Sequence, residues 1–140
     1  MKLSTGKKPF KIEFDTGDVE TIYFNPNDPD LAEKLNSLGK RVEERIKNLK
    51  DIEIDEQGNP VNANEIEIYS AFKTALYEEI DKTFGYPVCE KVFKHCSALA
   101  SVDGEFFIKQ FVNNITPEVE KEIFKEQEKM QKHIGEYVNK

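Results

Sequence analysis

The spacing of apolar residues changes near residue 28, and this change constrains the fold more than any other feature of the sequence. Before it, Phe10, Ile12 and Phe14 alternate with polar neighbours, which is the period of a half-buried β-strand. After it, apolar residues recur every three or four positions, which is the period of an amphipathic α-helix. The chain is therefore expected to form a small β element followed by a helical body.

Residues 8–25 predict an antiparallel β-hairpin. The sequence DTGD follows the first alternating segment, and Gly17 can take the positive φ of a tight turn. The segment VETIYFN then supplies a second strand rich in β-branched and aromatic residues. Because an isolated hairpin is only marginally stable in water, its apolar face is expected to pack on the rest of the chain.

Residues 29–140 predict a bundle of about five helices. The expected helices cover residues 31–49, 66–84, 87–98, 105–115 and 117–138. Gly85 and Pro87 end the second of them, and Thr116 with Pro117 supplies the N-cap and first turn of the last. The predicted fold class is α+β and mostly α, with the N-terminal β-hairpin packed on the helical bundle in a single domain over residues 1–140.

The charge of the chain limits the classes of partner. It has 27 Asp and Glu against 20 Lys and Arg, a formal net charge of −7. Binding to phosphate backbones relies on Lys and Arg, so neither nucleic acid nor an anionic membrane surface is an expected partner. The first residues lack the apolar core of a signal peptide, and no apolar run approaches the roughly 18 residues of a membrane span. We expect a cytoplasmic protein whose partners are proteins.

The segment GYPVCEKVFKHC, residues 85–96, holds both cysteines and one of the two histidines. On a helix, Cys89 and Cys96 would lie two turns apart, about 10 Å, whereas a disulfide needs Cα atoms within about 7 Å. The segment also lacks the short Cys-x₂₋₄-Cys spacing of zinc sites. We therefore expect no metal and no cofactor, and interpret the segment as an apolar helix face on which cysteines act as small hydrophobic side chains.

The sequence carries none of the common catalytic motifs. G-x-S-x-G, H-E-x-x-H and a glycine-rich phosphate loop are all absent. Asp103 and Gly104 match only the Asp-Gly of a calcium loop, because none of Ala98, Ala100 and Ser101 before them supplies a carboxylate. The prediction is that the protein is not an enzyme.

The aromatic-rich segment EFFIKQFVNNI, residues 105–115, has two interpretations. Its apolar residues cover more than half of the helix circumference, so it is either buried on several sides or partly exposed as a docking surface. The candidate partner-binding surface comprises Phe106, Phe107, Phe111, Ile115, Val119 and Ile123. The final helix is rich in Glu, Lys and Gln, and Gln127 interrupts its apolar stripe, so it either projects or pairs with another chain.

The order KPFKIEFDTGDVETIYFN, EIYSAFKTALYEEIDKTFGYP and FFIKQFVNNITPEV resembles the small acidic tail assembly chaperones of siphophages and prophages of Gram-positive bacteria. The resemblance covers most of the chain and lies in the layout of its elements. It implies a non-catalytic, mostly helical protein that binds apolar helices of a tape measure protein and helps recruit tail tube subunits. It also implies a protein that forms homo-oligomers, works in the host cell cytoplasm and is absent from the finished virion.

Two other functions stay open. A structural tail or head–tail component would persist in the virion, and an exposed hairpin edge that extends a neighbour's sheet would favour it. A small acidic regulatory or inhibitory protein would occupy the basic site of a host protein, which carboxylates gathered on one face would favour. Along the sequence the carboxylates are spread over every helix, which argues against the second alternative.

Overall fold

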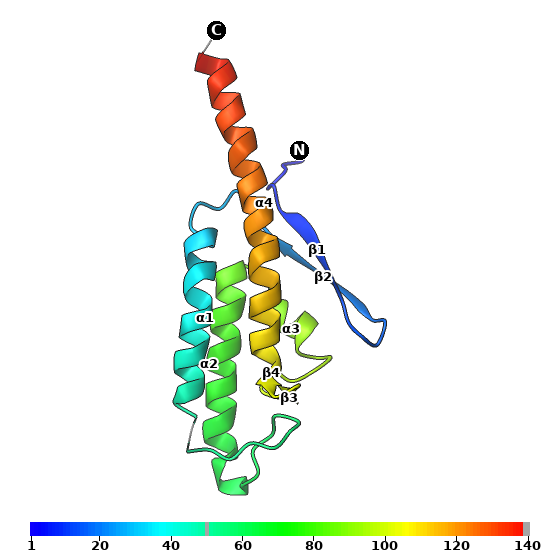
Figure 1. Ribbon diagram of the computed structural model, residues 1–140, viewed down its shortest axis with the longest axis vertical. Coiled ribbons are helices and arrows are strands. Elements are labelled where there is room, and N and C mark those ends of the chain that lie inside the picture. Colours follow the sequence, from blue (N-terminus) through cyan, green and yellow to red (C-terminus); the bar gives the residue numbers. More distant parts are fainter. Residues whose placement is uncertain (50, 139–140) are drawn as a thin grey trace.

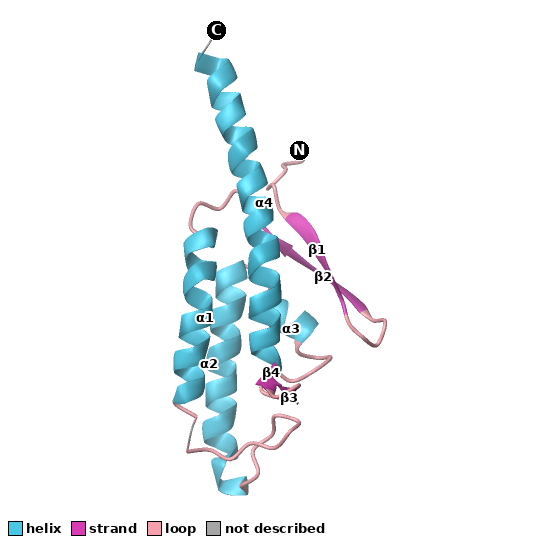
Figure 2. Ribbon diagram, in the orientation of Figure 1, coloured by secondary structure: helices cyan, strands magenta, loops and turns pink. Residues whose placement is uncertain are grey.

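The computed structural model describes residues 1–49 and 51–138. In this part of the chain a hairpin precedes four α-helices, so the predicted class, α+β and mostly α, is confirmed. Helices α1 (Leu31–Lys47), α2 (Ile66–Phe84) and α4 (Phe107–Val138) run lengthwise beside one another, as Figures 1 and 2 show. The hairpin and the short helix α3 (Val88–Val92) lie on the flank of α4.

The N-terminal hairpin pairs β1 (Lys8–Glu13) with β2 (Val19–Phe24) in antiparallel register. The Phe14 N–H donates to the Asp18 carbonyl at 2.9 Å, and Gly17 takes a φ of +90° in the turn. This pairing confirms the predicted hairpin. One face of the hairpin packs inward and places Ile22 and Phe24 in the core.

One buried cluster joins the hairpin to the helices. Its fully buried members come from β2 and from α1, α2, α3 and α4: Ile22, Phe24, Leu35, Leu38, Val42, Leu76, Ile80, Val88, Val92, Ile108 and Val119. The apolar helix faces predicted from the sequence supply most of these residues. Each face is shielded from water only when it packs against another helix.

A second, smaller cluster lies at the lower end of the bundle in Figure 1, where the loop from Asp51 to Asn62 leads into the 3₁₀ turn η1 (Ala63–Glu65). Leu49, Tyr69 and Leu99 are buried together there. Gly58 has a φ of +84°, and a Cβ at this position would lie 2.7 Å from the Ala100 backbone nitrogen. The loop therefore approaches the chain before β3 so closely that only glycine fits.

The predicted helix over 87–98 is wrong beyond Val92, where α3 ends. The chain turns there instead and buries Ala98, Leu99 and Ala100. Strands β3 (Ser101–Val102) and β4 (Glu105–Phe106) follow and form a small hairpin, so the helix predicted over 105–115 begins only at Phe107. The carbonyls of Ala98 and Ala100 accept bonds from the first N–H groups of α4, at 2.9 Å each, which gives the open helix end its partners.

The predicted break at Thr116 and Pro117 is also wrong, because α4 continues through both residues. This merger reduces the expected five helices to four in the described part of the chain. A proline inside a helix removes one backbone hydrogen bond and costs roughly 3 kcal/mol. Ile115 and Val119 are buried on either side of Pro117, so the packing of both halves holds the helix together. The Thr116 hydroxyl donates to the Val112 carbonyl at 2.7 Å.

No helix within the described residues combines the length and the apolar character needed to cross a membrane.

Candidate functional site

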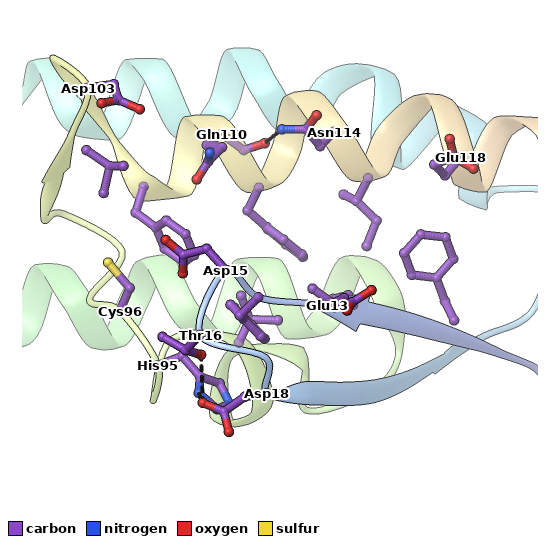
Figure 3. A pocket seen from close by; sticks show the side chains of 18 residues that line it. Glu13, Asp15, Thr16, Asp18, His95, Cys96, Asp103, Gln110, Asn114 and Glu118 are labelled. Carbon is purple, nitrogen blue, oxygen red and sulfur yellow. Dashed lines mark hydrogen bonds and ion pairs between the residues drawn. The ribbon is translucent and has the colours of Figure 1, made fainter.

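A groove of about 750 Å³ lies between the hairpin and α4. Figure 3 shows Asn114 and Glu118 on α4 at one side of this space, and Glu13 and Asp15 of the hairpin at the other. The segment between α3 and the β3–β4 turn closes one end. The hairpin, which is far from the other two parts in sequence, thus forms one depression with the segment after α3 and the start of α4.

The α4 wall of the groove is a single face of the helix. Its residues recur with helical spacing: Phe107, Gln110, Phe111, Asn114, Ile115 and Glu118. The apolar members are buried or partly buried and form the floor, whereas the polar members are exposed and form an edge.

The hairpin wall is formed by β1 and the turn after it: Phe10, Ile12, Glu13, Phe14, Asp15, Thr16 and Asp18. Strand β2, which is described in full, contributes no lining residue, so the groove follows the outer side of β1. Strand alternation turns the apolar side chains of this wall toward the core and leaves its carboxylates exposed.

His95 and Lys94 fasten the hairpin wall to the segment after α3. The Glu20 carboxylate lies 2.8 Å from Lys94 Nζ and 2.8 Å from His95 Nε2. The hydrogen bond from Lys94, and to a smaller extent the one with His95, lowers the pKa of Glu20 from 4.5 to about 2. The Phe14 ring packs on the imidazole with centroids 4.3 Å apart. These contacts hold the hairpin wall of the groove against the segment after α3.

The edges of the groove are acidic. Its lining includes five carboxylates and no Lys or Arg: Glu13, Asp15, Asp18, Asp103 and Glu118. Lys121 Nζ lies 3.9 Å from the Glu118 carboxylate, and the His95 imidazole lies 3.8 Å from the Asp18 carboxylate. The ion pairs among the described residues include none with the other three carboxylates. An apolar floor thus lies between acidic edges, and among the described residues Glu118 is the one lining carboxylate with a lysine within 4 Å.

The six residues predicted as a partner-binding surface do not form one exposed surface. Phe111, Ile115, Val119 and Ile123 are buried, and Phe106 and Phe107 are partly buried against the core. The interpretation of residues 105–115 as core packing therefore holds for most of the segment. Three of the six, Phe107, Phe111 and Ile115, still contribute to the groove floor.

Sequence reasoning missed the hairpin side of the site. The alternation of Phe10, Ile12 and Phe14 predicts an apolar strand face, but it does not indicate that this face borders a groove. The acidic turn DTGD was interpreted as a turn only. Its two Asp residues also line the groove because folding brings the turn opposite α4.

Cys89 packs in the core, whereas Cys96 is partly exposed. Cys89 is 3% exposed, and burial raises the pKa of its thiol. Cys96 lies past the end of α3 and lines the groove, and its thiol pKa is also raised by burial. Both are free, and no group of three His, Cys, Asp or Glu side chains within the described residues is arranged to hold a metal ion.

Beyond Ile123, α4 extends past the rest of the molecule, as Figure 1 shows. We call residues 124–138 the α4 extension. Its large apolar side chains are exposed: Phe124, Met130, Ile134, Tyr137 and Val138. Near its start, Lys8 Nζ lies 2.6 Å from Glu126 Oε1. This hydrogen-bonded pair lowers the pKa of Glu126 and raises the pKa of Lys8.

Comparisons of the chain with protein family models, with curated proteins and with solved structures find no match.

Proposed function

We propose that the chain is a non-catalytic phage tail assembly chaperone that binds apolar helices of a tape measure protein in the host cell cytoplasm. The observation that supports this proposal is the groove, whose apolar floor lies between β1 and one face of α4. A helix can lay its apolar side chains into such a depression and leave its polar face in water. The resemblance in layout supplies the class of client, and the groove supplies a place to hold it.

The test is affinity capture from cells that express the neighbouring genes, with bound proteins identified by mass spectrometry. Asn114 and Asn113 are adjacent exposed residues of α4, but only Asn114 lines the groove. Asn114→Trp should therefore fill the groove, whereas Asn113→Trp provides a matched control with the same change of side chain. We expect a long helix-rich protein to be captured by the wild type and the control but not by Asn114→Trp. Equal capture by all three would contradict the proposal.

A structural tail or head–tail component is the alternative, and it would be found in purified particles. The outer edge of β1 gives it little support. Because the Phe14 N–H bonds to Asp18, alternation directs the backbone groups of Pro9, Lys11 and Glu13 away from β2. Pro9 has no N–H and Lys11 carries a charge, and both discourage the addition of a neighbour's strand.

An acidic regulatory or inhibitory protein is the second alternative, and the carboxylates at the groove edges favour it. Such a protein would bind a folded basic surface in a one-to-one complex and inhibit its function. A chaperone would instead bind the isolated helical segment and keep it from aggregating. Light scattering of the client segment, with and without the protein, separates these two outcomes.

A second copy of the chain is the partner that we propose for the α4 extension. Met130, Ile134 and Tyr137 recur at intervals of four and three, a stripe that can pack against an identical stripe. Sedimentation equilibrium of the wild type should give a mass above the 16.2 kDa of one chain. Met130→Lys with Ile134→Lys should reduce it to one chain, whereas Gln131→Lys with His133→Lys should not. A monomeric wild type would refute this proposal alone.

A further inference from the structure

We propose that the groove selects a cationic amphipathic helix, whose apolar side chains contact the floor while its Lys or Arg side chains pair with the carboxylates at both edges. This inference rests on the proposed function because it concerns the same groove. It goes further by naming the chemistry of the occupant, which the proposed function leaves open.

The length of the groove suits a helical segment. On α4 its lining extends from Phe107 to Glu118, which corresponds to about 16 Å, or three helical turns. Along β1 and the residue after it, the lining extends from Phe10 to Phe14, about 13 Å. A partner helix of about three turns would present apolar side chains at intervals of three and four along this length.

The charges at the edges determine which helix is preferred. Glu13 and Asp15 lie on the hairpin side and Glu118 on the α4 side, so a bound helix would have carboxylates along both flanks. Among the described residues, Lys121 lies 3.9 Å from Glu118, and no ion pair involves Glu13 or Asp15. Two other nearby lysines have partners outside the groove. Lys94 is paired with Glu20 at 2.8 Å, and Lys109 with Glu43 at 3.6 Å.

The same charges exclude other occupants. Nucleic acid and anionic membrane surfaces would bring phosphate groups against carboxylates, which is repulsive. An acidic helix would meet the same repulsion on both flanks. A neutral apolar helix would contact the floor but gain nothing from the edges. The difference in affinity between a cationic and a neutral helix therefore measures the contribution of the edge carboxylates.

The experiment uses three synthetic peptides of about 16 residues that share one apolar stripe and differ only in their flanking residues, which are Lys, Gln or Glu. Because the chain contains no Trp, one Trp in each peptide reports binding to the full-length protein by fluorescence. We expect the Lys peptide to bind best and the Glu peptide worst. The advantage of the Lys peptide should shrink as salt is added, because salt screens exposed charges.

Matched variants test the role of the edges. Glu13→Gln, Asp15→Asn and Glu118→Gln together remove three edge carboxylates. Glu44→Gln, Glu120→Gln and Glu128→Gln together change the net charge equally, at exposed positions that do not line the groove. Each exposed charge pair contributes roughly a twofold factor to the affinity. The first variant should therefore weaken binding of the Lys peptide about tenfold. The second should change its affinity less than twofold, and neither should change the affinity of the Gln peptide.

Cys96 shows where the peptide binds. It lines the groove, so the bound Lys peptide should slow its modification by N-ethylmaleimide, as measured by mass spectrometry. Asn114→Trp adds a Trp to the protein, so it is assayed by mass spectrometry, and it should abolish this protection. Equal affinities for the Lys and Gln peptides, with Cys96 protected by both, would overturn the charge inference and leave the chaperone proposal standing. Binding of the Lys peptide without protection of Cys96, or equal weakening by both triple variants, would overturn the inference as well.

Discussion

At the scale of single residues, Glu20 holds two parts of the groove together. It lies on β2, while its partners Lys94 and His95 follow α3, so one carboxylate joins the hairpin to the helical body. His95 also lines the groove and packs on Phe14 of the opposite wall. The position of the β1 wall therefore depends on an ion pair as well as on apolar packing.

The lowered pKa of Glu20 makes part of the stability depend on pH. The carboxylate titrates at about 2 in the folded chain and at its ordinary 4.5 when unfolded, so its contribution is complete above pH 4.5. That contribution is lost as the pH falls from 4.5 through about 2. We expect Glu20→Gln to lower the denaturation midpoint at pH 7 and to lose this difference from the wild type near pH 2. Lys94→Met should have little further effect in the Glu20→Gln background, and fully additive effects would contradict the ion pair.

At the scale of elements, α4 has two different halves. Its first half, through Ile123, contributes to the core and to the groove, whereas the α4 extension exposes its apolar side chains. Pro117 lies inside the first half, and packing on both sides keeps the helix continuous there. A single helix therefore both forms one wall of the groove and presents a second surface away from it.

The proline in α4 leads to a prediction about stability. Because Pro117 removes a helical hydrogen bond, Pro117→Ala should raise the free energy of unfolding by about 1–3 kcal/mol, measured by urea denaturation. Pro29→Ala is the control, because Pro29 precedes α1 and interrupts no helix. Destabilisation by Pro117→Ala would indicate that α4 consists of two helices separated at this residue.

At the scale of the whole molecule, the hairpin and the helices share one buried cluster. Ile22 of β2 and Leu38 of α1 are both 0% exposed in it. The groove occurs where this cluster leaves part of its surface uncovered between β1 and α4. Its shape is consequently a property of the packed molecule and not of any one element.

The shared cluster predicts that the hairpin and the helices unfold in one transition. Ile22→Ala should destabilise the helices as well as the hairpin, by about 2–4 kcal/mol, because it leaves a cavity in their common core. Far-ultraviolet circular dichroism follows the helices, and amide hydrogen exchange at β2 follows the hairpin. Lys11→Ala, at an exposed position of β1, is the control. Loss of hairpin protection at a denaturant concentration that leaves the helices intact would show two separate units.

Most of the element order could be predicted from local patterns. The alternation at Phe10, Ile12 and Phe14, the turn at Gly17 and the helix end at Gly85 each follow from the chemistry of a few neighbouring residues. The errors occurred at α3 and at Pro117, where local preference and packing disagree. The need to bury Ala98 and Leu99 ended α3 early, and the burial of Ile115 and Val119 carried α4 through the proline.

The sequence by itself determined the fold class, because the period of its apolar residues decides whether a strand or a helix can hide them from water. It also determined the acidic character of the surface. Only the tertiary structure decided that Phe111 belongs to the core, that the carboxylates of the first turn lie across the groove from Glu118 of α4, and that the α4 extension remains exposed. The physical reason is that a groove depends on which apolar faces cover one another, and this is settled by contacts between residues far apart in the chain.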